Sequence, residues 1–180
     1  MEKIQLYDKC FVPYLEEKQI LEAIDRVAEK VNADFRGCTD IPVILCILNG
    51  AIMFTSELIK RLDFNFEFAS LKLSSYVGTS STGQVKALNG INGNVKGRRV
   101  IVCEDIVDTG NSMEFLRGML EKEGATEVRI CTMLFKPEVF QKSFKLDYVA
   151  KEIPNDIIVG YGLDYNELGR GFKDIYVIQK

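Results

Sequence analysis

Short apolar runs that lead through a turn into a helical pattern recur along this chain, and this alternation limits the folds available to it. Residues 41–48 form a buried apolar run that precedes a helical pattern at residues 51–62. The same order returns where the apolar run 100–103 precedes a helix that we expect over residues 112–124. Strands that alternate with helices favour an α/β fold with a mostly parallel sheet flanked by helices.

Other segments extend this pattern at both ends of the chain. Apolar residues at helical spacing predict an amphipathic helix over residues 15–31. Further strands are expected at residues 64–74, 128–135, 148–150, 157–161 and 175–178. Ligands of such sheets bind beyond the carboxyl ends of the strands, where the two turns lie.

Length and charge restrict the partners of the chain. With 180 residues, of which 47% are hydrophobic, we expect one domain over residues 1–180. The net charge of -3 and the scattered basic residues argue against a nucleic-acid partner. No stretch resembles a signal core or a membrane span, so we expect a cytoplasmic protein without a membrane partner.

The sequence contains no histidine, which excludes Ser-His-Asp and Cys-His nucleophiles and histidine zinc sites. Asp, Glu, Lys or Tyr must therefore carry any proton transfer. The five cysteines include no CxxC pair. We expect all of them to be reduced core thiols, because free cysteine packs as a small hydrophobic side chain.

Three acids gather in VIVCEDIVDTGNS, residues 100–112. Glu104 and Asp105 point to opposite sides of an extended chain and could accept hydrogen bonds from two sugar hydroxyls. Residues 109–112 open a helix, where free N–H groups and the helix dipole can hold a phosphate monoester. Alternatively, Asp105 and Asp108 only favour a helix N-terminus. The clustering argues against this, because the acids repel one another unless a cation or hydroxyl groups satisfy them.

The same segment resembles the phosphoribosyl pyrophosphate signature of type I phosphoribosyltransferases. Three more segments are similar to the hypoxanthine-guanine branch of that family: LCILNGA (residues 45–51), LSSYVGTSSTG (73–83), and VGYGLDYN (159–166) followed by Arg170. The resemblance covers nearly the whole chain. It implies a Rossmann-like parallel sheet with a small hood.

The resemblance also implies roles for the acids and the turn. Glu104 and Asp105 would hold the ribose hydroxyls and Asp108 would be the acid/base group on the purine ring. Glu104, Asp105 and Asp164 would contact magnesium, the expected cofactor. The terminal phosphate of the sugar would be surrounded by Asp108, Thr109, Gly110, Asn111 and Ser112.

Pyrophosphate would bind at residues that resemble the family's pyrophosphate loop and its arginine. These are Leu48, Asn49, Gly50 and Arg170, with a cis peptide before Asn49. Ser75-Tyr76 resembles a serine-tyrosine pair on a mobile active-site loop, which we place at residues 75–97 and which would exclude water on closing. Without the resemblance, Asn49-Gly50 is an ordinary turn and Tyr76 a surface aromatic.

The purine base would be read by three residues in the second half of the chain. Lys136 is similar to the lysine that donates a hydrogen bond to the exocyclic oxygen of the purine. Its alternative is a solvated lysine at a strand end. Ile158 would offer backbone groups to the base edge, and Ile157 stands where an aromatic residue usually stacks. Other departures from the family pattern are Asn49 and Asn111 in place of lysines and Ala51 in place of a glycine.

The implied activity is transfer of the phosphoribosyl group from phosphoribosyl pyrophosphate to hypoxanthine or guanine, giving IMP or GMP and pyrophosphate in purine salvage. We expect a homodimer or homotetramer whose partners are these small molecules. One alternative is an enzyme that prefers xanthine. Another is a regulator of the same fold that binds nucleotide or RNA, and a plain nucleotide-binding module is a third. The regulator should show a basic face or a damaged catalytic set, and this chain is acidic and keeps Asp108.

Overall fold

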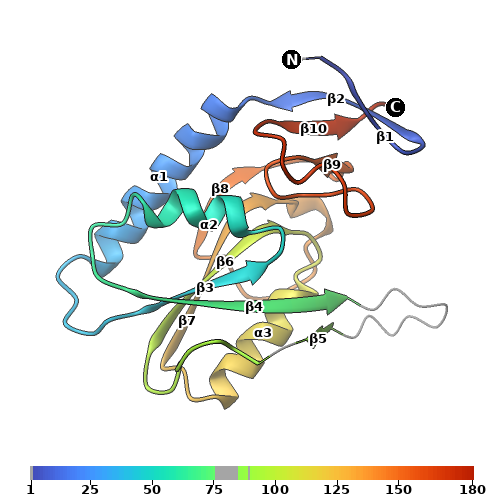
Figure 1. The fold of residues 1–180 in the computed structure, drawn as a ribbon. Helices are drawn as coiled ribbons and strands as arrows, with labels where there is room; N and C mark the ends of the chain where they lie inside the picture. Colours follow the sequence, from blue (N-terminus) through green and yellow to red (C-terminus); the bar gives the residue numbers. More distant parts are fainter. Residues whose placement is uncertain (1, 76–84, 89) are drawn as a thin grey trace.

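A computed structural model gives the fold and describes residues 2–75, 85–88 and 90–180. Its centre is a six-stranded sheet in the order β5-β4-β3-β6-β7-β8 (Figure 1). The strands are β3 (Val43–Leu48), β4 (Glu67–Ser75), β5 (Val85–Ala87), β6 (Arg99–Val107), β7 (Glu127–Phe135) and β8 (Tyr148–Glu152). All are parallel to their neighbours except β5, which pairs antiparallel with β4. The predicted parallel α/β sheet is confirmed.

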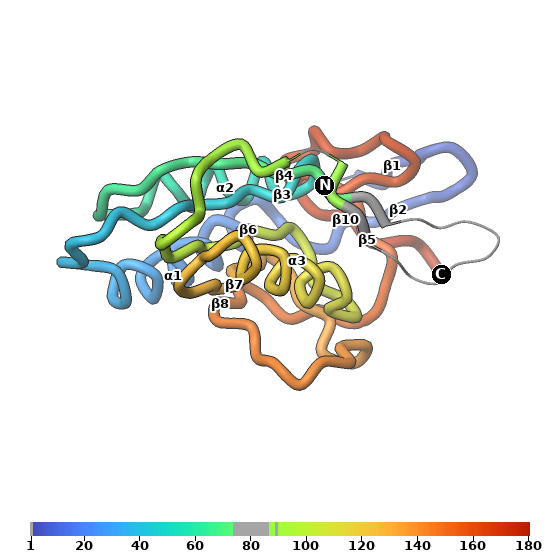
Figure 2. Tube along the Cα trace, turned by 90° about the horizontal axis from the view of Figure 1, so that it is seen from below, coloured from blue at the N-terminus to red at the C-terminus, as the bar shows by residue number. Residues whose placement is uncertain are grey.

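Helices cover both faces of this sheet. The apolar stripes of α1 (Glu17–Phe35) and α2 (Ile52–Ile59) pack on one face, and α3 (Asn111–Lys122) packs on the other. Seen from below, α3 lies in front of the strands (Figure 2). α1 continues past the predicted end at residue 31 because Phe35 is fully buried and stacks on Phe64, with ring centroids 5.4 Å apart.

A second, antiparallel sheet forms the hood above the carboxyl ends of the parallel strands. Its order is β1-β2-β10-β9, and the two ends of the chain meet there (Figure 1). The strands are β1 (Ile4–Leu6), β2 (Lys9–Leu15), β9 (Ile158–Val159) and β10 (Ile175–Ile178). Leu6, Phe11, Val159 and Tyr176 form its apolar centre. The hood was predicted, but its first two strands were not, because charged residues interrupt the apolar ones there.

Several sequence predictions are wrong in detail. β6 continues to Val107, so the acids at 104 and 105 lie inside a strand rather than after it. Gly110, not Ser112, is the residue that precedes the first turn of α3. The polar stretch 75–97 contains β5, which gains its hydrogen bonds from β4. All five cysteines are free, but only three are core thiols: Cys38 is exposed and Cys10 half-buried, because neither lies on a strand of the central sheet.

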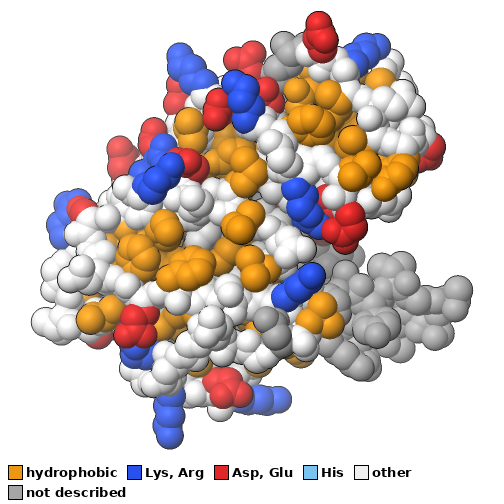
Figure 3. All heavy atoms as spheres, viewed as in Figure 1, with side chains coloured by type: hydrophobic (Ala, Val, Ile, Leu, Met, Phe, Trp, Pro, Cys, Tyr) orange, Lys and Arg blue, Asp and Glu red, His pale blue; other side chains and the backbone are white. Residues whose placement is uncertain are grey.

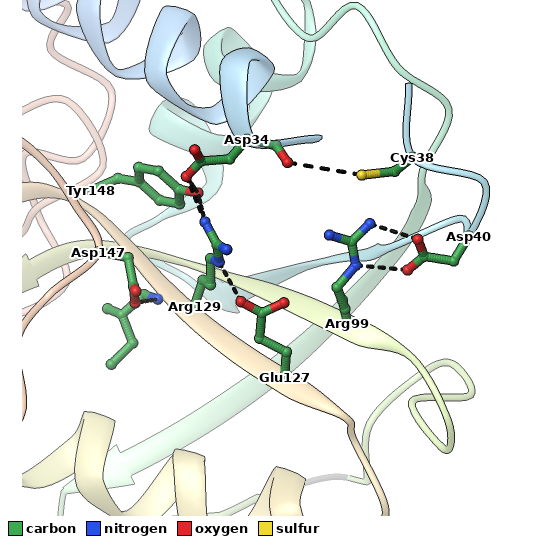
Figure 4. Close-up of polar contacts among 9 residues, drawn as sticks. Asp34, Cys38, Asp40, Arg99, Glu127, Arg129, Asp147 and Tyr148 are labelled. Carbon is green, nitrogen blue, oxygen red and sulfur yellow. Dashed lines mark hydrogen bonds and ion pairs between the residues drawn. The ribbon is translucent and has the colours of Figure 1, made fainter. Parts of the chain in front are cut away.

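Charged side chains form a network of ion pairs at the amino-terminal ends of the parallel strands (Figure 4). We call this end of the sheet its amino edge, and the opposite end its carboxyl edge. Arg129 Nη1 bonds Asp34 Oδ2 at 2.5 Å and the Tyr148 hydroxyl at 2.7 Å. Arg99 forms a bidentate ion pair with Asp40, with N to O distances of 2.7 and 2.6 Å. Hydrogen bonding from Arg99 lowers the pKa of Asp40. The charges at this edge therefore satisfy one another.

One face of the protein exposes hydrophobic side chains over α2 and β4 (Figure 3). Ile52 of α2 is 56% exposed and Phe68 of β4 is 54% exposed. Exposed apolar residues that gather in one region are typical of surfaces that contact other molecules. Within the part of the chain that the structure describes, no helix is both long and apolar enough to cross a membrane.

Candidate active site

The acidic pair lies near the carboxyl end of β6. Glu104 is buried and Asp105 half-buried, and each carboxylate accepts the N–H of the following residue, at 3.1 and 2.8 Å. Burial and the adjacent Asp105 carboxylate raise the pKa of Glu104 well above its usual range. Burial also raises the pKa of Asp105, although the positive charge of Arg170 offsets part of this rise. Two neighbouring carboxyls in a dry position favour a ligand that carries positive charge or hydroxyl donors.

The turn between β3 and α2 packs directly on this pair. A Cβ atom on Gly50 would lie 1.6 Å from Asp105 Oδ2, so only glycine permits the approach. On its other side, a Cβ atom on Gly162 would lie 2.0 Å from the carbonyl oxygen of Gly50. The Leu48–Asn49 peptide is cis, as in the family loop that these residues resemble. Three segments far apart in the sequence thus meet at Gly50.

The third of these segments, residues 160–170, follows β9 and carries Asp164 and Arg170. Arg170 Nη2 lies 2.6 Å from Asp164 Oδ1, and Arg170 Nη1 donates to the carbonyl of Gly162 at 2.9 Å. The Gly162 N–H in turn donates to the carbonyl of Arg170 at 2.9 Å. The guanidinium is therefore anchored to the glycine that touches Gly50.

The predicted phosphate turn, residues 108–112, follows β6 and opens α3. Gly110 has a left-handed φ of 83° and takes the N-cap position. It has no side chain to cap the helix, so the N–H groups of the first turn can face an anion. A Cβ atom on Gly110 would lie 2.6 Å from Phe140 Cε2 and 2.7 Å from Lys142 Cγ. Glycine is required here by conformation and by packing.

Lys136 is buried, which contradicts its alternative reading as a solvated lysine at a strand end. Its side chain is 10% exposed, and its Nζ lies 3.9 Å from Asp108 Oδ2 and 3.3 Å from Asn155 Oδ1. The Asp108 side chain is 49% exposed. An ammonium held in a mostly dry position beside an accessible carboxylate is suited to bind a polar ligand.

Other predicted residues lie around this centre in different settings. Ile157 is 50% exposed, and its carbonyl accepts the Ile178 N–H at 2.8 Å. Ile158 is buried in β9 opposite Val177 of β10. Ser75 is the last residue of β4. Tyr76 lies outside the described residues, as does much of the predicted loop 75–97.

The expected metal ligands do not form one cluster. Among residues 2–75, 85–88 and 90–180, no three His, Cys, Asp or Glu side chains are grouped so that they could hold an ion. Glu104 and Asp105 are adjacent, whereas Asp164 is paired with Arg170. Magnesium is often held by one or two carboxylates together with substrate phosphates. The acidic pair alone therefore fits such an ion.

Comparison with known proteins agrees with this geometry. The sequence profile of the phosphoribosyl transferase domain matches residues 13–166. The chain belongs to the phosphoribosyl transferase family. It is 37% identical to the hypoxanthine-guanine phosphoribosyltransferase of Streptococcus thermophilus over 165 residues, which are 91% of each chain. It is 38% identical to that of Streptococcus agalactiae over 170 residues, 94% of this chain and 93% of the relative.

Solved phosphoribosyltransferase structures share the fold. A hypoxanthine-guanine phosphoribosyltransferase from Bacillus anthracis matches with a TM-score of 0.87 and 32% identity, over 93% of this chain and 98% of that one. A hypoxanthine phosphoribosyltransferase from Staphylococcus aureus matches with a TM-score of 0.86 and 32% identity, over 93% and 91%. The family and the fold that the sequence predicted are confirmed.

Sequence reasoning missed several residues of this phosphoribosyltransferase site. Gly162 contacts Gly50, Asn155 contacts Lys136, and Phe140 and Lys142 cover Gly110. Gly162 has a φ of 97°, and the GYG pattern of residues 160–162 was a usable signal for it. The others carry no local pattern, because their roles depend on contacts between distant segments.

Proposed function

We propose that this chain transfers the phosphoribosyl group of phosphoribosyl pyrophosphate to hypoxanthine or guanine, giving IMP or GMP and pyrophosphate in purine salvage. The meeting of Gly50, Asp105 and Gly162 carries the proposal. It joins the candidate pyrophosphate loop, the acidic pair and the segment of Arg170 at one point. The names of the streptococcal relatives support the same activity.

The reaction breaks the bond between the sugar carbon and pyrophosphate and forms a bond to a purine nitrogen. No protein nucleophile is needed, because the transition state resembles the oxocarbenium ion of glycoside cleavage. Glu104 and Asp105 would hold the ribose hydroxyls and so fix the sugar carbon. The first turn of α3 would bind the terminal phosphate through its N–H groups. The protein thus acts mainly by positioning.

Asp108 is the proposed acid/base group for the purine proton. Its carboxylate is half-exposed and lies 3.9 Å from the buried Lys136 ammonium, so it is accessible to a ligand and near a cation. Lys136 would donate to the exocyclic oxygen of the base, held in place by Asn155. Ile158 and Ile157 would flank the base edge and the ring.

Leu48, Asn49, Gly50 and Arg170 are the proposed pyrophosphate-binding residues. Arg170 is fixed by Asp164 and by the Gly162 carbonyl, so its guanidinium would meet the leaving group with little loss of conformational entropy. Ser75 and Tyr76 would also contact the substrates, as their resemblance to the family's serine-tyrosine pair implies.

Glu104 and Asp105 fit a bound Mg²⁺, because they are hard oxygen donors whose raised pKa values a nearby cation would reverse. When bound, the ion supplies charge neutralisation for the departing pyrophosphate. Asp164 would join as a ligand only if its contact with Arg170, at 2.6 Å, were exchanged.

We also propose that the chain forms one cytoplasmic domain, residues 1–180, and assembles into a homodimer or homotetramer. The exposed hydrophobic face that includes Ile52 and Phe68 supports self-association. Light scattering coupled to size-exclusion chromatography tests the assembly, and a monomer at micromolar concentration would contradict it.

The activity is tested by measuring nucleotide formation from each purine base and phosphoribosyl pyrophosphate, with Mg²⁺ and with EDTA. We expect IMP and GMP to form only with the metal, because the acidic pair and pyrophosphate otherwise repel each other. Parallel reactions with xanthine and adenine test the base preference. Undiminished turnover in EDTA would remove the metal from the proposal, and no product with hypoxanthine or guanine would refute the activity.

A further inference from the structure

The connection between β7 and β8, residues 136–147, lies against the predicted phosphate turn, and we call it the flap. It includes a short 3-10 turn, Pro137–Val139. The Gln141 N–H donates to the carbonyl of Thr109 at 3.3 Å. Phe140 and Lys142 occupy the space beside the Gly110 Cα, at 2.6 and 2.7 Å from where a Cβ would stand. The flap therefore supports the turn from outside.

The flap also begins at the residue proposed to read the base. The Lys136 N–H donates to the carbonyl of Val107 at 2.9 Å, and its Nζ lies near Asp108. One short segment thus contacts β6 immediately before the phosphate turn and contacts the turn itself four to six residues later. A displacement of the flap would change the geometry of the turn.

An ion pair joins the tip of the flap to the first turn of α3. Lys142 Nζ lies 2.7 Å from Glu114 Oε2, and the two side chains are 15% and 61% exposed. The Glu114 N–H donates to the carbonyl of Gly110 at 3.0 Å, so Glu114 is itself bonded to the turn. The pair therefore holds Lys142 across Gly110.

The flap has other attachments that do not depend on this pair. The rings of Phe135 and Phe140 are 5.2 Å apart, and those of Phe140 and Phe144 are 5.5 Å apart. The guanidinium of Arg117 on α3 lies 5.0 Å from the Phe144 ring centroid. Because these contacts anchor the flap on α3, loss of the ion pair should loosen only its tip.

We infer that Lys142 is a positioning residue for the phosphate of phosphoribosyl pyrophosphate. Its ion pair with Glu114 keeps the flap against Gly110 and so holds the N–H groups of residues 109–112 in the arrangement that binds the phosphate. The inference rests on the proposed function, because it names a determinant of binding for that same substrate.

The test compares Lys142→Met, Glu114→Gln, the double variant and Lys142→Arg by steady-state kinetics and by calorimetry with phosphoribosyl pyrophosphate. Arg36→Met is the matched control. Its ion pair with Asp63, at 2.5 Å, also joins distant segments but lies at the amino edge of the sheet. Melting temperatures show whether each variant folds.

Lys142→Met and Glu114→Gln should each raise the KM and Kd for phosphoribosyl pyrophosphate about three- to fivefold, the range expected for loss of a partly exposed ion pair. The kcat and the KM for the base should not change. The double variant should match the single ones, because they remove one interaction. Lys142→Arg should behave as wild type.

Two results would overturn the inference alone. The first is that both single variants match Arg36→Met while the wild-type chain is active. The second is that Glu114→Gln lowers the KM while Lys142→Met raises it, which would mean that Lys142 binds the phosphate directly and competes for it with Glu114. A wild-type chain that does not bind phosphoribosyl pyrophosphate would refute the proposed function as well.

Discussion

At the amino edge of the parallel sheet, Arg99 and Arg129 each meet carboxylates at hydrogen-bond distance (Figure 4), whereas Glu104 and Asp105 lie next to each other towards the carboxyl edge. The effect on the pKa differs accordingly. Hydrogen bonding to Arg99 lowers the pKa of Asp40, and burial beside Asp105 raises that of Glu104. At the amino edge each of these arginines meets a carboxylate, whereas the nearest charged neighbour of the Glu104 carboxyl is the carboxyl of Asp105.

This difference separates a structural edge from a functional one. Charges that pair within the chain contribute modestly to stability, and they already have partners, so they do not require a ligand. Buried carboxyls that lie side by side destabilise their own ionised forms, and a cation or hydroxyl ligand relieves this. Strained electrostatics at the carboxyl edge therefore mark the place where a ligand supplies the missing partner.

The largest expected effect is a loss of turnover when the proposed acid/base group at the carboxyl edge is replaced. Asp108→Asn should lower turnover by roughly 10²–10⁴, the usual share of such a group, while folding and phosphoribosyl pyrophosphate binding persist. Asp34→Asn at the amino edge is the control and should leave turnover unchanged. Single-turnover kinetics and calorimetry provide the measurements, and equal turnover in the two variants would assign the acid/base role elsewhere.

The next effect concerns base choice. Lys136→Met should weaken the use of hypoxanthine and reduce its advantage over adenine by roughly tenfold to a hundredfold, because a charge-assisted bond worth about 1.5–3 kcal/mol is lost. Competition between the two bases measures this ratio. Lys60→Met, at an exposed lysine directly after α2, should leave this ratio unchanged. Full discrimination retained without the Lys136 ammonium would exclude it as the determinant.

Breaking the amino edge should alter stability and not catalysis. Arg129→Met removes bonds to Asp34, Glu127 and Tyr148, and we expect the free energy of unfolding to fall by about 1–2 kcal/mol, since the acids are partly exposed and regain water. Urea unfolding measures the loss, and kinetics below the transition measure kcat/KM. A fall in kcat/KM of the folded variant would contradict the separation of the two edges.

The smallest expected effect is a gain in stability, in contrast to the loss expected for Arg129→Met. A carboxyl whose pKa is higher in the folded than in the unfolded chain binds its proton more tightly when folded, so stability falls as pH rises from about 4 through the folded-state pKa. Glu104→Gln removes this loss. In EDTA, the variant should be more stable than wild type by about 0.5–1.5 kcal/mol at pH 7 and similar near pH 4.

The comparison variant for this pH series is Glu127→Gln, which removes a carboxylate that accepts from Arg129 at 2.6 Å. It should lose stability at pH 7 rather than gain it. Thermal unfolding of both variants between pH 4 and 8 measures the contrast. If Glu104→Gln were the less stable chain at pH 7, the acidic pair would not be under electrostatic strain.

Much of the fold was predictable because local patterns carry it. The apolar runs at β3, β6 and β7 and the helical spacing of α1 and α3 located these elements to within a few residues. β1 and β2 were missed because charged residues at positions 2, 3, 8 and 9 flank their short apolar stretches, which are buried only when they meet β10 and residues of β9. The end of α1 was missed because contacts made by Phe35 decide it.

The sequence by itself determined the order of strands and helices and the acidic segment at the carboxyl end of β6, because hydrophobic periodicity and turn residues act over short stretches of chain. It also determined the family through motifs that the comparisons confirm. Only the tertiary structure decided that Gly50 touches Asp105 and Gly162, that Lys136 is buried, and that the flap covers Gly110. These are contacts between segments far apart in the chain, and packing, which no local pattern encodes, brings them together.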